Sequence, residues 1–157
     1  MTPLVLLAAI GAGTMGGFFY AFSGLVMPSL RRLDPPGAMK AMQTINVVVL
    51  SPHFFALFFG TAALSLAIIV SGVVWPEGAP TWLAIAGGSV YLAAIIGVTV
   101  AANVPMNQAL AAADAGAPEG AALWAHYLKR WTAWNHVRAV GGMVSLALFL
   151  ASLVARA

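Results

Sequence analysis

A small set of polar and aromatic residues is spread through an otherwise apolar chain. Asparagine amides both donate and accept hydrogen bonds, histidine exchanges protons near neutral pH, and arginine holds anions. Tryptophan rings can stack on a flat ligand. The residues that could bind or act on a flat or anionic ligand are Asn46, His53, Asn103, Asn107, Trp131, Trp134, Asn135 and Arg138.

Each of these residue types also has a purely structural interpretation. Asparagine amides can hydrogen-bond neighbouring membrane helices, tryptophans gather at the membrane interface, and arginine can extend its charge to the lipid headgroups. A lone histidine in a membrane helix can be a hydrogen-bonded structural residue. His126 and His136 are weaker candidates, because they project away from the helix face that carries Arg138. The residue types alone leave both interpretations open.

The elements that must position these residues are membrane helices. The chain of 157 residues is 62% hydrophobic and only 7% charged, whereas soluble domains are about 25% charged. This composition excludes a soluble globular protein, a disordered chain and a nucleic-acid binder. A membrane-spanning helix needs about 20 apolar residues. Four stretches without Asp, Glu, Lys or Arg meet or approach that length: Met1 to Leu30, Ala41 to Pro76, Gly78 to Ala113 and Ala139 to Ala155.

We therefore predict an all-α, integral membrane four-helix bundle that forms a single domain over residues 1–157. The predicted spans run from about Pro3 to Leu30, from a break or kink at Pro52 to Val74, from Pro80 to Asn103, and from Glu119 to near the C-terminus. The fourth helix has an extended amphipathic start before its apolar half. The residues predicted to share one face of it are Trp124, Tyr127, Trp131, Asn135, Arg138 and Gly142.

The charges predict an orientation in the membrane. Arg31, Arg32 and Lys40 lie between spans one and two, and Lys129, Arg130 and Arg138 lie before or at the start of the apolar run of the fourth span, so that both connections are basic. The turn around Glu77, by contrast, has no Lys or Arg. By the positive-inside rule, the basic connections are cytoplasmic and both termini lie outside the cytoplasm, in a bacterial-type inner or plasma membrane. The expected partners are membrane lipids. The GxxxG spacing of Gly13 and Gly17 leaves a homo-oligomer open.

Metal chemistry has little support in the residue types. The chain has no cysteine, and its four acidic residues all lie outside the apolar cores. A disulfide, a thiolate metal site and a carboxylate-bridged metal site are therefore not expected.

Four short motifs, in order along the chain, resemble those of the anthrone-oxygenase-like membrane family. They are Tyr20-Ala-Phe22-Ser-Gly-Leu-Val-Met-Pro28, Met42-Gln-Thr-Ile-Asn46, Asn103-Val-Pro-Met-Asn107 and Trp131-Thr-Ala-Trp-Asn-His-Val-Arg138. Tyr20 stands where phenylalanine is expected. The resemblance extends over the whole chain, and it implies a four-helix membrane bundle.

The resemblance also implies a chemistry. Fungal members of this family are associated with oxidising polyketide anthrones to anthraquinones with molecular oxygen and without an apparent cofactor, whereas most bacterial members, which this chain resembles more closely, have no assigned substrate. We accordingly expect a small aromatic ligand and no cofactor. The expected catalytic residues are His53 as the base and Arg138 with Asn103 at an oxyanion, and the expected substrate-binding residues are Asn46, Asn107, Trp131, Trp134 and Asn135.

A second hypothesis comes from a different class of protein. The same residues suit a non-enzymatic membrane protein that binds a lipid, a quinone or haem. A bis-histidine haem would require His53 and His136 to face each other across the bundle, and no spacing in the sequence demands that.

Overall fold

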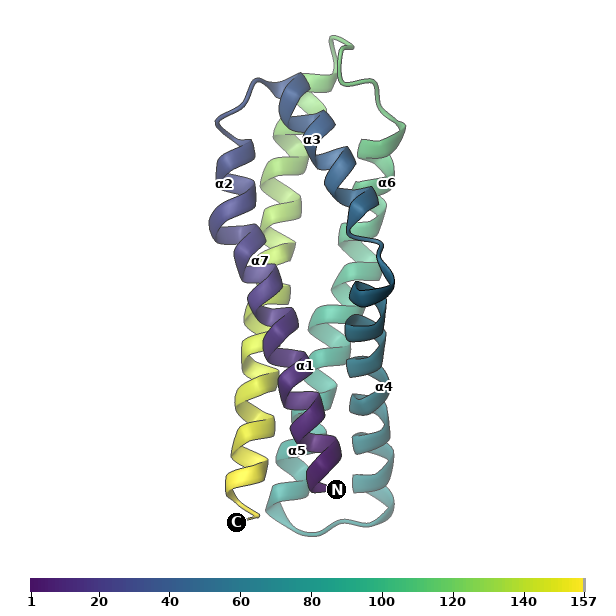
Figure 1. The fold of residues 1–157 in the computed structure, drawn as a ribbon, viewed down its shortest axis with the longest axis vertical. Coiled ribbons are helices and arrows are strands. Elements are labelled where there is room, and N and C mark those ends of the chain that lie inside the picture. The colour runs from purple at the N-terminus through teal and green to yellow at the C-terminus, as the bar shows by residue number, and fades with distance from the viewer. Residues whose placement is uncertain (157) are drawn as a thin grey trace.

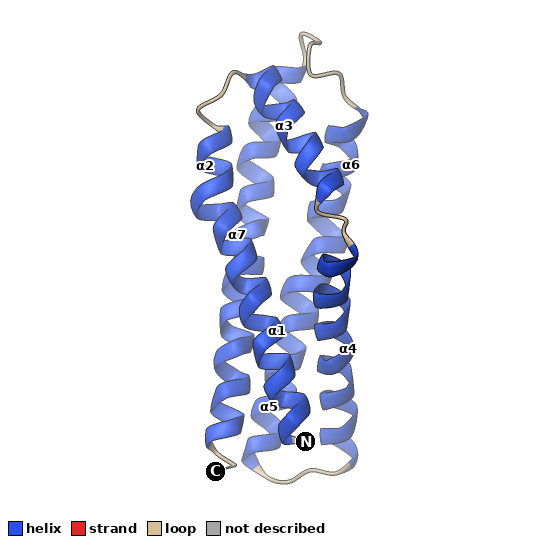
Figure 2. Cartoon of the chain, viewed as in Figure 1, coloured by secondary structure: helices blue, strands red, loops and turns tan. Residues whose placement is uncertain are grey.

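The structure, a computed structural model, describes residues 1–156, and over that range its helices are joined by short loops without any strand (Figures 1 and 2). Its elements are α1 (Thr2–Ala21), η1 (Phe22–Val26), α2 (Met27–Leu30), α3 (Pro35–Val48), α4 (Pro52–Val74), α5 (Ala79–Val90), η2 (Tyr91–Gly97), η3 (Thr99–Asn103), α6 (Val104–Ala112) and α7 (Gly120–Val154). The segments labelled η are π-helical turns that continue the neighbouring α-helices.

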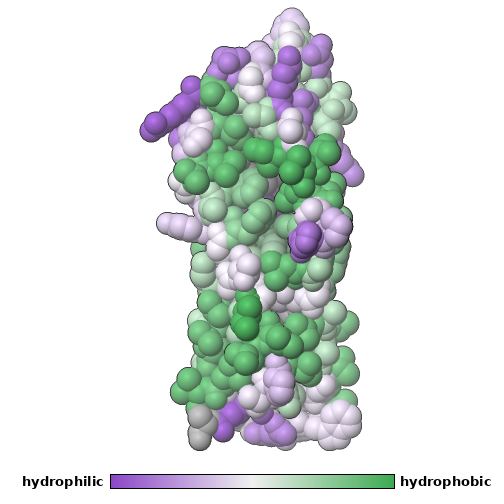
Figure 3. Space-filling view, in the orientation of Figure 1, coloured by the Kyte–Doolittle hydropathy of each residue, from purple (hydrophilic) through white to green (hydrophobic). Residues whose placement is uncertain are grey.

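Four helices are long and apolar enough to cross a membrane. They are Thr2–Leu30, Pro52–Val74, Ala79–Ala112 and Gly120–Val154. This confirms the predicted all-α class and the four spans. In Figure 3 hydrophobic side chains cover much of the middle of the molecule, and most hydrophilic side chains gather near its two ends, with one further hydrophilic group about half-way along. The four spans therefore indicate an integral membrane protein.

The helix boundaries follow from local signals in the sequence. Asp34 caps α3, because its carboxylate accepts a hydrogen bond from the Gly37 amide at 3.0 Å. Ser51 caps α4 by accepting from the Phe54 amide at 3.3 Å, and Pro52 occupies the first turn. Because proline disfavours a helical residue before it, Ser51 is extended and residues 49–51 separate α3 from α4 (Figure 2).

Two helices approach each other closely through small residues. Gly16 of α1 meets Gly142 of α7, and a Cβ atom built on Gly142 would lie 2.5 Å from the Gly16 Cα. Gly17, by contrast, has open space at its Cβ position. Gly16 and Gly142 therefore mark where α1 and α7 touch, as small residues do in membrane bundles.

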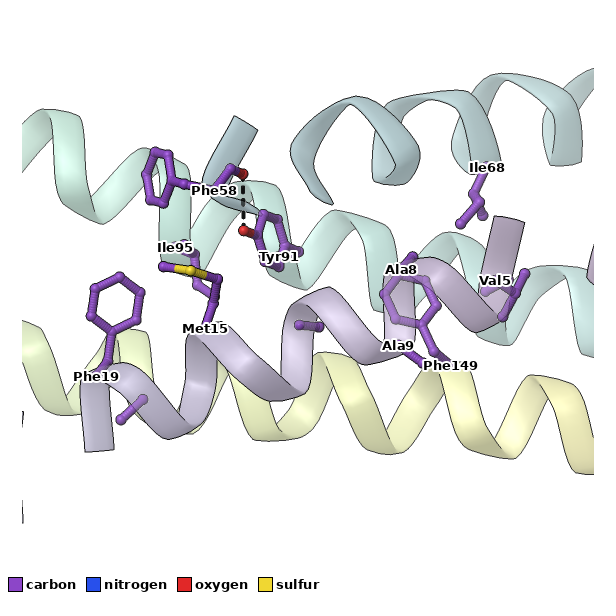
Figure 4. Close-up of a cluster of buried hydrophobic side chains, with 13 residues drawn as sticks. Val5, Ala8, Ala9, Met15, Phe19, Phe58, Ile68, Tyr91, Ile95 and Phe149 are labelled. Atoms are coloured by element: carbon purple, nitrogen blue, oxygen red, sulfur yellow. Dashed lines mark hydrogen bonds between the residues drawn. The ribbon is translucent and has the colours of Figure 1, made fainter. Parts of the chain in front are cut away.

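The buried apolar residues form two clusters along the bundle. The larger one joins α1, α4, α5, η2 and α7, and Figure 4 shows it with Met15, Phe58, Tyr91 and Phe149. The smaller one lies toward the opposite end and includes Met27, Met39, Met42, Tyr127 and Trp131.

The N-terminus and Arg156 lie beside the turn between α4 and α5 (Figure 1). Arg156 joins these segments by pairing with Glu77 at 2.7 Å and donating to the Thr81 hydroxyl at 3.2 Å. That hydrogen bond from Arg156 holds the pKa of the Glu77 carboxyl below its usual range.

Candidate functional site

A cavity of about 90 Å³ lies between α1, the break that separates α3 from α4, η3 and α7. Aromatic and aliphatic side chains make up most of its wall, and four polar side chains interrupt them. The lining residues are Phe18, Phe19, Phe22, Ile45, Asn46, Val49, Leu50, Phe54, Thr99, Val104, Asn107, Trp131 and Arg138. An apolar cavity with a few converging polar groups is the usual form of a small-molecule site.

One face of α7 supplies the inner wall of this region. Tyr127, Trp131, Asn135 and Arg138 follow one another at spacings of four, four and three residues, and all four are buried. Residues at these spacings share a helix face. The rings of Trp124, Tyr127 and Trp131 also stack in a row, with centroids 5.7 and 5.9 Å apart. The face of α7 predicted from the sequence is therefore the buried one.

Asn107 holds two of these aromatic side chains in place. Its Oδ1 atom accepts a hydrogen bond from the Tyr127 hydroxyl at 2.8 Å and another from the Trp131 Nε1 atom at 2.8 Å. The Tyr127 hydroxyl in turn accepts from the Asn46 Nδ2 atom at 3.4 Å. This chain of hydrogen bonds connects α3, α6 and α7, and it fixes one polar edge of the cavity.

Arg138 forms the other polar edge. Only 5% of its surface is exposed. Its Nη2 atom donates to the Asn135 Oδ1 atom at 2.8 Å and its Nη1 atom donates to the Thr99 hydroxyl at 3.2 Å. The guanidinium carbon lies 4.2 Å from the centre of the Phe19 ring and 5.0 Å from that of Trp131. Aromatic faces attract a cation in this way.

The charge of Arg138 has no acidic partner in the described part of the chain. The single ion pair within residues 1–156 joins Arg156 to Glu77. The Nε atom of Arg138 is buried and has no hydrogen-bond partner. A buried cation is normally paired, because removing it from water is costly. The cavity wall thus presents an uncompensated positive charge.

Two further asparagines lie behind the wall. Asn135 is fully buried, and its Nδ2 atom donates to the Phe19 carbonyl and the Ser23 hydroxyl, both at 2.7 Å. Asn103 is also fully buried and donates to the Trp131 carbonyl at 3.3 Å, while its Oδ1 atom has no partner. Asn135 therefore orients Arg138 toward the cavity, and Asn103 supports the turn that carries Trp131.

The structure brings most of the predicted site residues together. Asn46, Asn107, Trp131 and Arg138 line the cavity, and Asn103 and Asn135 lie directly behind it.

His53 and Trp134 lie elsewhere. His53 is exposed in the first turn of α4, and Trp134 is 39% exposed on the outer side of α7. Neither residue lines the cavity. His126 and His136 are exposed too.

Sequence reasoning missed several residues of the site. Phe22 and Ser23 belong to the first motif, and that motif was a usable signal for them, whereas Phe19 lies one residue before it. Thr99 precedes Asn103 by one helical turn, and Tyr127 precedes Trp131 by one turn. Both spacings indicated these two residues, although neither was selected as a site residue.

Two of the π-helical turns contribute to the cavity wall. Phe22 begins η1 and Thr99 begins η3, and both residues line the cavity. A proline follows each of these two segments closely, Pro28 after η1 and Pro105 after η3. A proline ring clashes with the carbonyl one turn earlier, and a wider turn relieves that clash. Such turns are frequent at functional sites.

No group of three or more His, Cys, Asp or Glu side chains within residues 1–156 could hold a metal ion. The polar part of the cavity consists of amides, one hydroxyl and one guanidinium. These groups donate hydrogen bonds and hold an anion, which suits an oxygen atom with negative charge on a flat apolar ligand.

Comparison with known proteins gives one match. A family model described as anthrone oxygenase matches residues 53–148, which is more than half of the chain. The matched range contains the motifs Asn103 to Asn107 and Trp131 to Arg138, whereas Tyr20 to Pro28 and Asn46 lie before it. No curated protein and no solved structure matches the chain.

Proposed function

The chain belongs to the anthrone oxygenase family, and on that premise we propose that it is a membrane oxygenase for a flat aromatic ketone of the anthrone type. The ketone oxygen binds at Arg138 as an enolate, and molecular oxygen reacts with the bound enolate directly. The observation that carries this proposal is the buried charge of Arg138 at the cavity wall, which has no acidic partner within residues 1–156.

The proposed reaction balances without a further reactant. An anthrone loses a proton to water from the carbon opposite its carbonyl, because no carboxylate or imidazole lines the cavity, and the resulting negative charge rests largely on the carbonyl oxygen. Molecular oxygen accepts electrons from the enolate and bonds to the opposite carbon, and a proton completes a hydroperoxide. Cleavage of the O–O bond and of the remaining C–H bond releases water and leaves a second carbonyl. One anthrone and one oxygen molecule therefore give one quinone and one water.

Arg138 would act at the first step. A fixed cation in a poorly hydrated site stabilises an oxyanion strongly, because little solvent screens the interaction. The Asn135 side chain holds one guanidinium nitrogen and Thr99 holds another. Their hydrogen bonds pre-orient the guanidinium, so that it need not reorganise when the charge forms.

The aromatic wall would hold the rings of the substrate. Phe22 and Trp131 lie with ring centroids 5.7 Å apart, and Phe18 and Phe54 lie 5.6 Å apart. These side chains offer ring faces and edges to a flat ligand. Asn46 and Asn107 would contact polar substituents at the opposite edge of the cavity.

The cavity must widen to admit such a ligand. Its volume is about 90 Å³, whereas a cavity of about 150 Å³ accommodates benzene. Val49 and Leu50 line it from the short linker between α3 and α4, and Phe54 follows in the first turn of α4. We assign the widening to this linker, because it lacks the hydrogen-bond ladder of a continuous helix.

Two substitutions of Arg138 test the proposal. Arg138→Lys keeps the positive charge and loses the planar guanidinium group with its fixed hydrogen-bond donors, whereas Arg138→Gln loses the charge. With anthrone as the substrate, we expect Arg138→Gln to lose about 100-fold or more in the rate above a protein-free control, and Arg138→Lys to be intermediate. Oxygen uptake, quinone absorbance and the detergent melting temperature are measured together.

The other outcomes have distinct meanings. If Arg138→Lys matches the unmodified protein in every assay, the positive charge is sufficient and the planar guanidinium has no role. If Arg138→Gln oxidises anthrone as fast as the unmodified protein, Arg138 stabilises no oxyanion. If Arg138→Gln does not extract as folded protein, the arginine is structural. Either of the last two results removes Arg138 from the site.

A second candidate function is binding without turnover. The lining of the cavity has no carboxylate and no imidazole, and this favours a protein that holds an aromatic ketone or quinone without removing a proton from it. Tight binding of anthraquinone with no oxygen uptake from anthrone would support this function. A Soret band in the purified protein would instead support haem binding.

We also propose the orientation that the charges predict, with both termini outside the cytoplasm. Ala79 lies at the turn between α4 and α5, and Ala121 lies in the first turn of α7 at the other end of the molecule; both are exposed. Single cysteines at these two positions should label from opposite sides of the membrane, with Ala79→Cys accessible from outside. Labelling of both from one side would contradict the topology.

A further inference from the structure

A groove rich in basic residues runs along the outside of the bundle, away from the cavity. Its volume is about 460 Å³, and it lies between the end of α2 and the first half of α7. The residues that line it are Arg31, Ala125, Leu128, Lys129, Thr132, Ala133 and His136. Neither Arg31 nor Lys129 forms an ion pair within residues 1–156. The Thr132 hydroxyl is buried and has no hydrogen-bond partner.

A second groove continues along the same side of α7. It has a volume of about 290 Å³, and Tyr20 of α1 forms its other wall. The residues of α7 that line it are Ala139, Val140, Met143, Val144 and Ala147, all apolar. Lys129, His136, Met143 and Ala147 follow at spacings of seven, seven and four residues. These spacings place both grooves on one helix face.

The two grooves together extend over the depth of one lipid leaflet. Lys129 of the basic groove and Val144 of the apolar groove are separated by 15 residues of α7, which corresponds to about 22 Å at a rise of 1.5 Å per residue. Half of a bilayer of about 40–45 Å, headgroup regions included, is about 20–22 Å. A lipid with its phosphate beside Lys129 would therefore lay an acyl chain along the apolar groove as far as the middle of the bilayer.

We propose that this composite groove is a specific site for an anionic phospholipid. Arg31 and Lys129 hold the phosphate of the headgroup, and the Thr132 hydroxyl donates a hydrogen bond to it. One acyl chain lies between Tyr20 and the apolar side chains of α7. The two cations without acidic partners select a negatively charged headgroup, and the apolar groove selects a lipid over a free phosphate.

The test compares two lipids that differ only in the headgroup. Dioleoyl phosphatidylglycerol and dioleoyl phosphatidylcholine are titrated onto the full-length protein in a neutral detergent, and native mass spectrometry measures the bound fraction. We expect tighter binding of phosphatidylglycerol. Arg31→Gln/Lys129→Gln should weaken that binding about 30-fold, because each cation near an anionic lipid contributes about a factor of five.

The adjacent residues supply a control of equal charge. Arg32 and Arg130 are exposed, and neither lines either groove. Arg32→Gln/Arg130→Gln should therefore change the affinity for phosphatidylglycerol by less than about threefold, which is below the loss expected for one bound cation. Equal losses in the two double variants would show diffuse charge attraction and would overturn the site. If Arg31→Gln/Lys129→Gln does not extract as folded protein, the two single variants replace it in the same comparison.

The apolar half of the site has its own test. Ala147→Phe should fill the apolar groove and weaken the binding of both lipids. Ala151 is also exposed but lies outside the groove, so Ala151→Phe should leave the binding of both lipids unchanged. Inorganic phosphate should not compete with phosphatidylglycerol. Competition by phosphate at an equal concentration, or no effect of Ala147→Phe, would overturn the assignment of a lipid.

Discussion

The two halves of the bundle bury their polar groups in different ways. In the half near the chain termini, hydroxyl groups bond to backbone carbonyls, as Ser145 does to Gly87 at 2.8 Å and Tyr91 does to Phe58 at 3.0 Å. In the half that holds the cavity, amides and a guanidinium bond to other side chains, several of them across helices, as Asn107 does to Tyr127 and Arg138 does to Thr99. The Nε atom of Arg138 and the Oδ1 atom of Asn103 have no partner there, and in the other half the Ser65 hydroxyl has none.

This difference separates a packing role from a binding role. A hydroxyl that donates to a backbone carbonyl has used its only donor, so it has no hydrogen left to donate to the oxygen of a ligand. An amide or guanidinium has more donors and acceptors than its neighbours satisfy, so that it can hold a ligand. The half near the chain termini keeps the helices together. The half that holds the cavity is positioned by that rigid part of the bundle.

The largest effect that we predict falls in the packed half. Gly142→Leu places a side chain where a Cβ alone would lie 2.5 Å from the Gly16 Cα. Because backbone cannot move aside as a flexible side chain can, we expect this variant not to extract as folded protein. Gly17→Ala is the matched control, since nothing lies within 4 Å of its Cβ position. Thermal melting in detergent, or the yield of monodisperse protein, measures both.

Two tyrosine substitutions sharpen the comparison at a smaller scale. Tyr127→Phe removes the bond to Asn107 and leaves the Asn46 amide without an acceptor. Tyr91→Phe removes one bond to the Phe58 carbonyl. Each should reduce the free energy of unfolding by about 1 kcal/mol. Only Tyr127→Phe should also weaken the binding of an aromatic ketone, by several-fold, which a fluorescence titration with anthraquinone would measure.

The contrast between the two halves of the bundle depends on the fluorescence titration with anthraquinone. If Tyr91→Phe weakens ligand binding as much as Tyr127→Phe does, then the packed half also controls the cavity, and the proposed division of the bundle is wrong.

The sequence was sufficient to predict the spans and one wall of the cavity. Long apolar stretches define membrane helices by composition alone. On α7 an unbroken helical period places Trp131, Asn135 and Arg138 on one face, and the structure buries all three. Both predictions succeed because they depend only on local composition and on the regular geometry of one helix.

The sequence was less informative wherever a helix changes its register. A continuous helix through residues 39–53 would place His53 on the same face as Asn46. Residues 49–51 interrupt that helix, so the faces of α3 and α4 are set independently. The π-helical turns η1 and η3 shift the register in the same way, and sequence periodicity alone cannot detect such an insertion.

The smallest effect that we predict concerns His53. This residue is exposed in the first turn of α4 and does not line the cavity, although its neighbour Phe54 does. A general base must come within hydrogen-bond reach of the proton that it removes. We therefore expect His53→Gln to leave the rate of anthrone oxidation within about twofold of the unmodified protein, whereas Phe54→Ala should weaken the binding of anthrone by opening the cavity wall. A loss of turnover in His53→Gln at unchanged melting temperature and unchanged ligand affinity would restore the base assignment, and it would require α4 to rotate when the substrate enters.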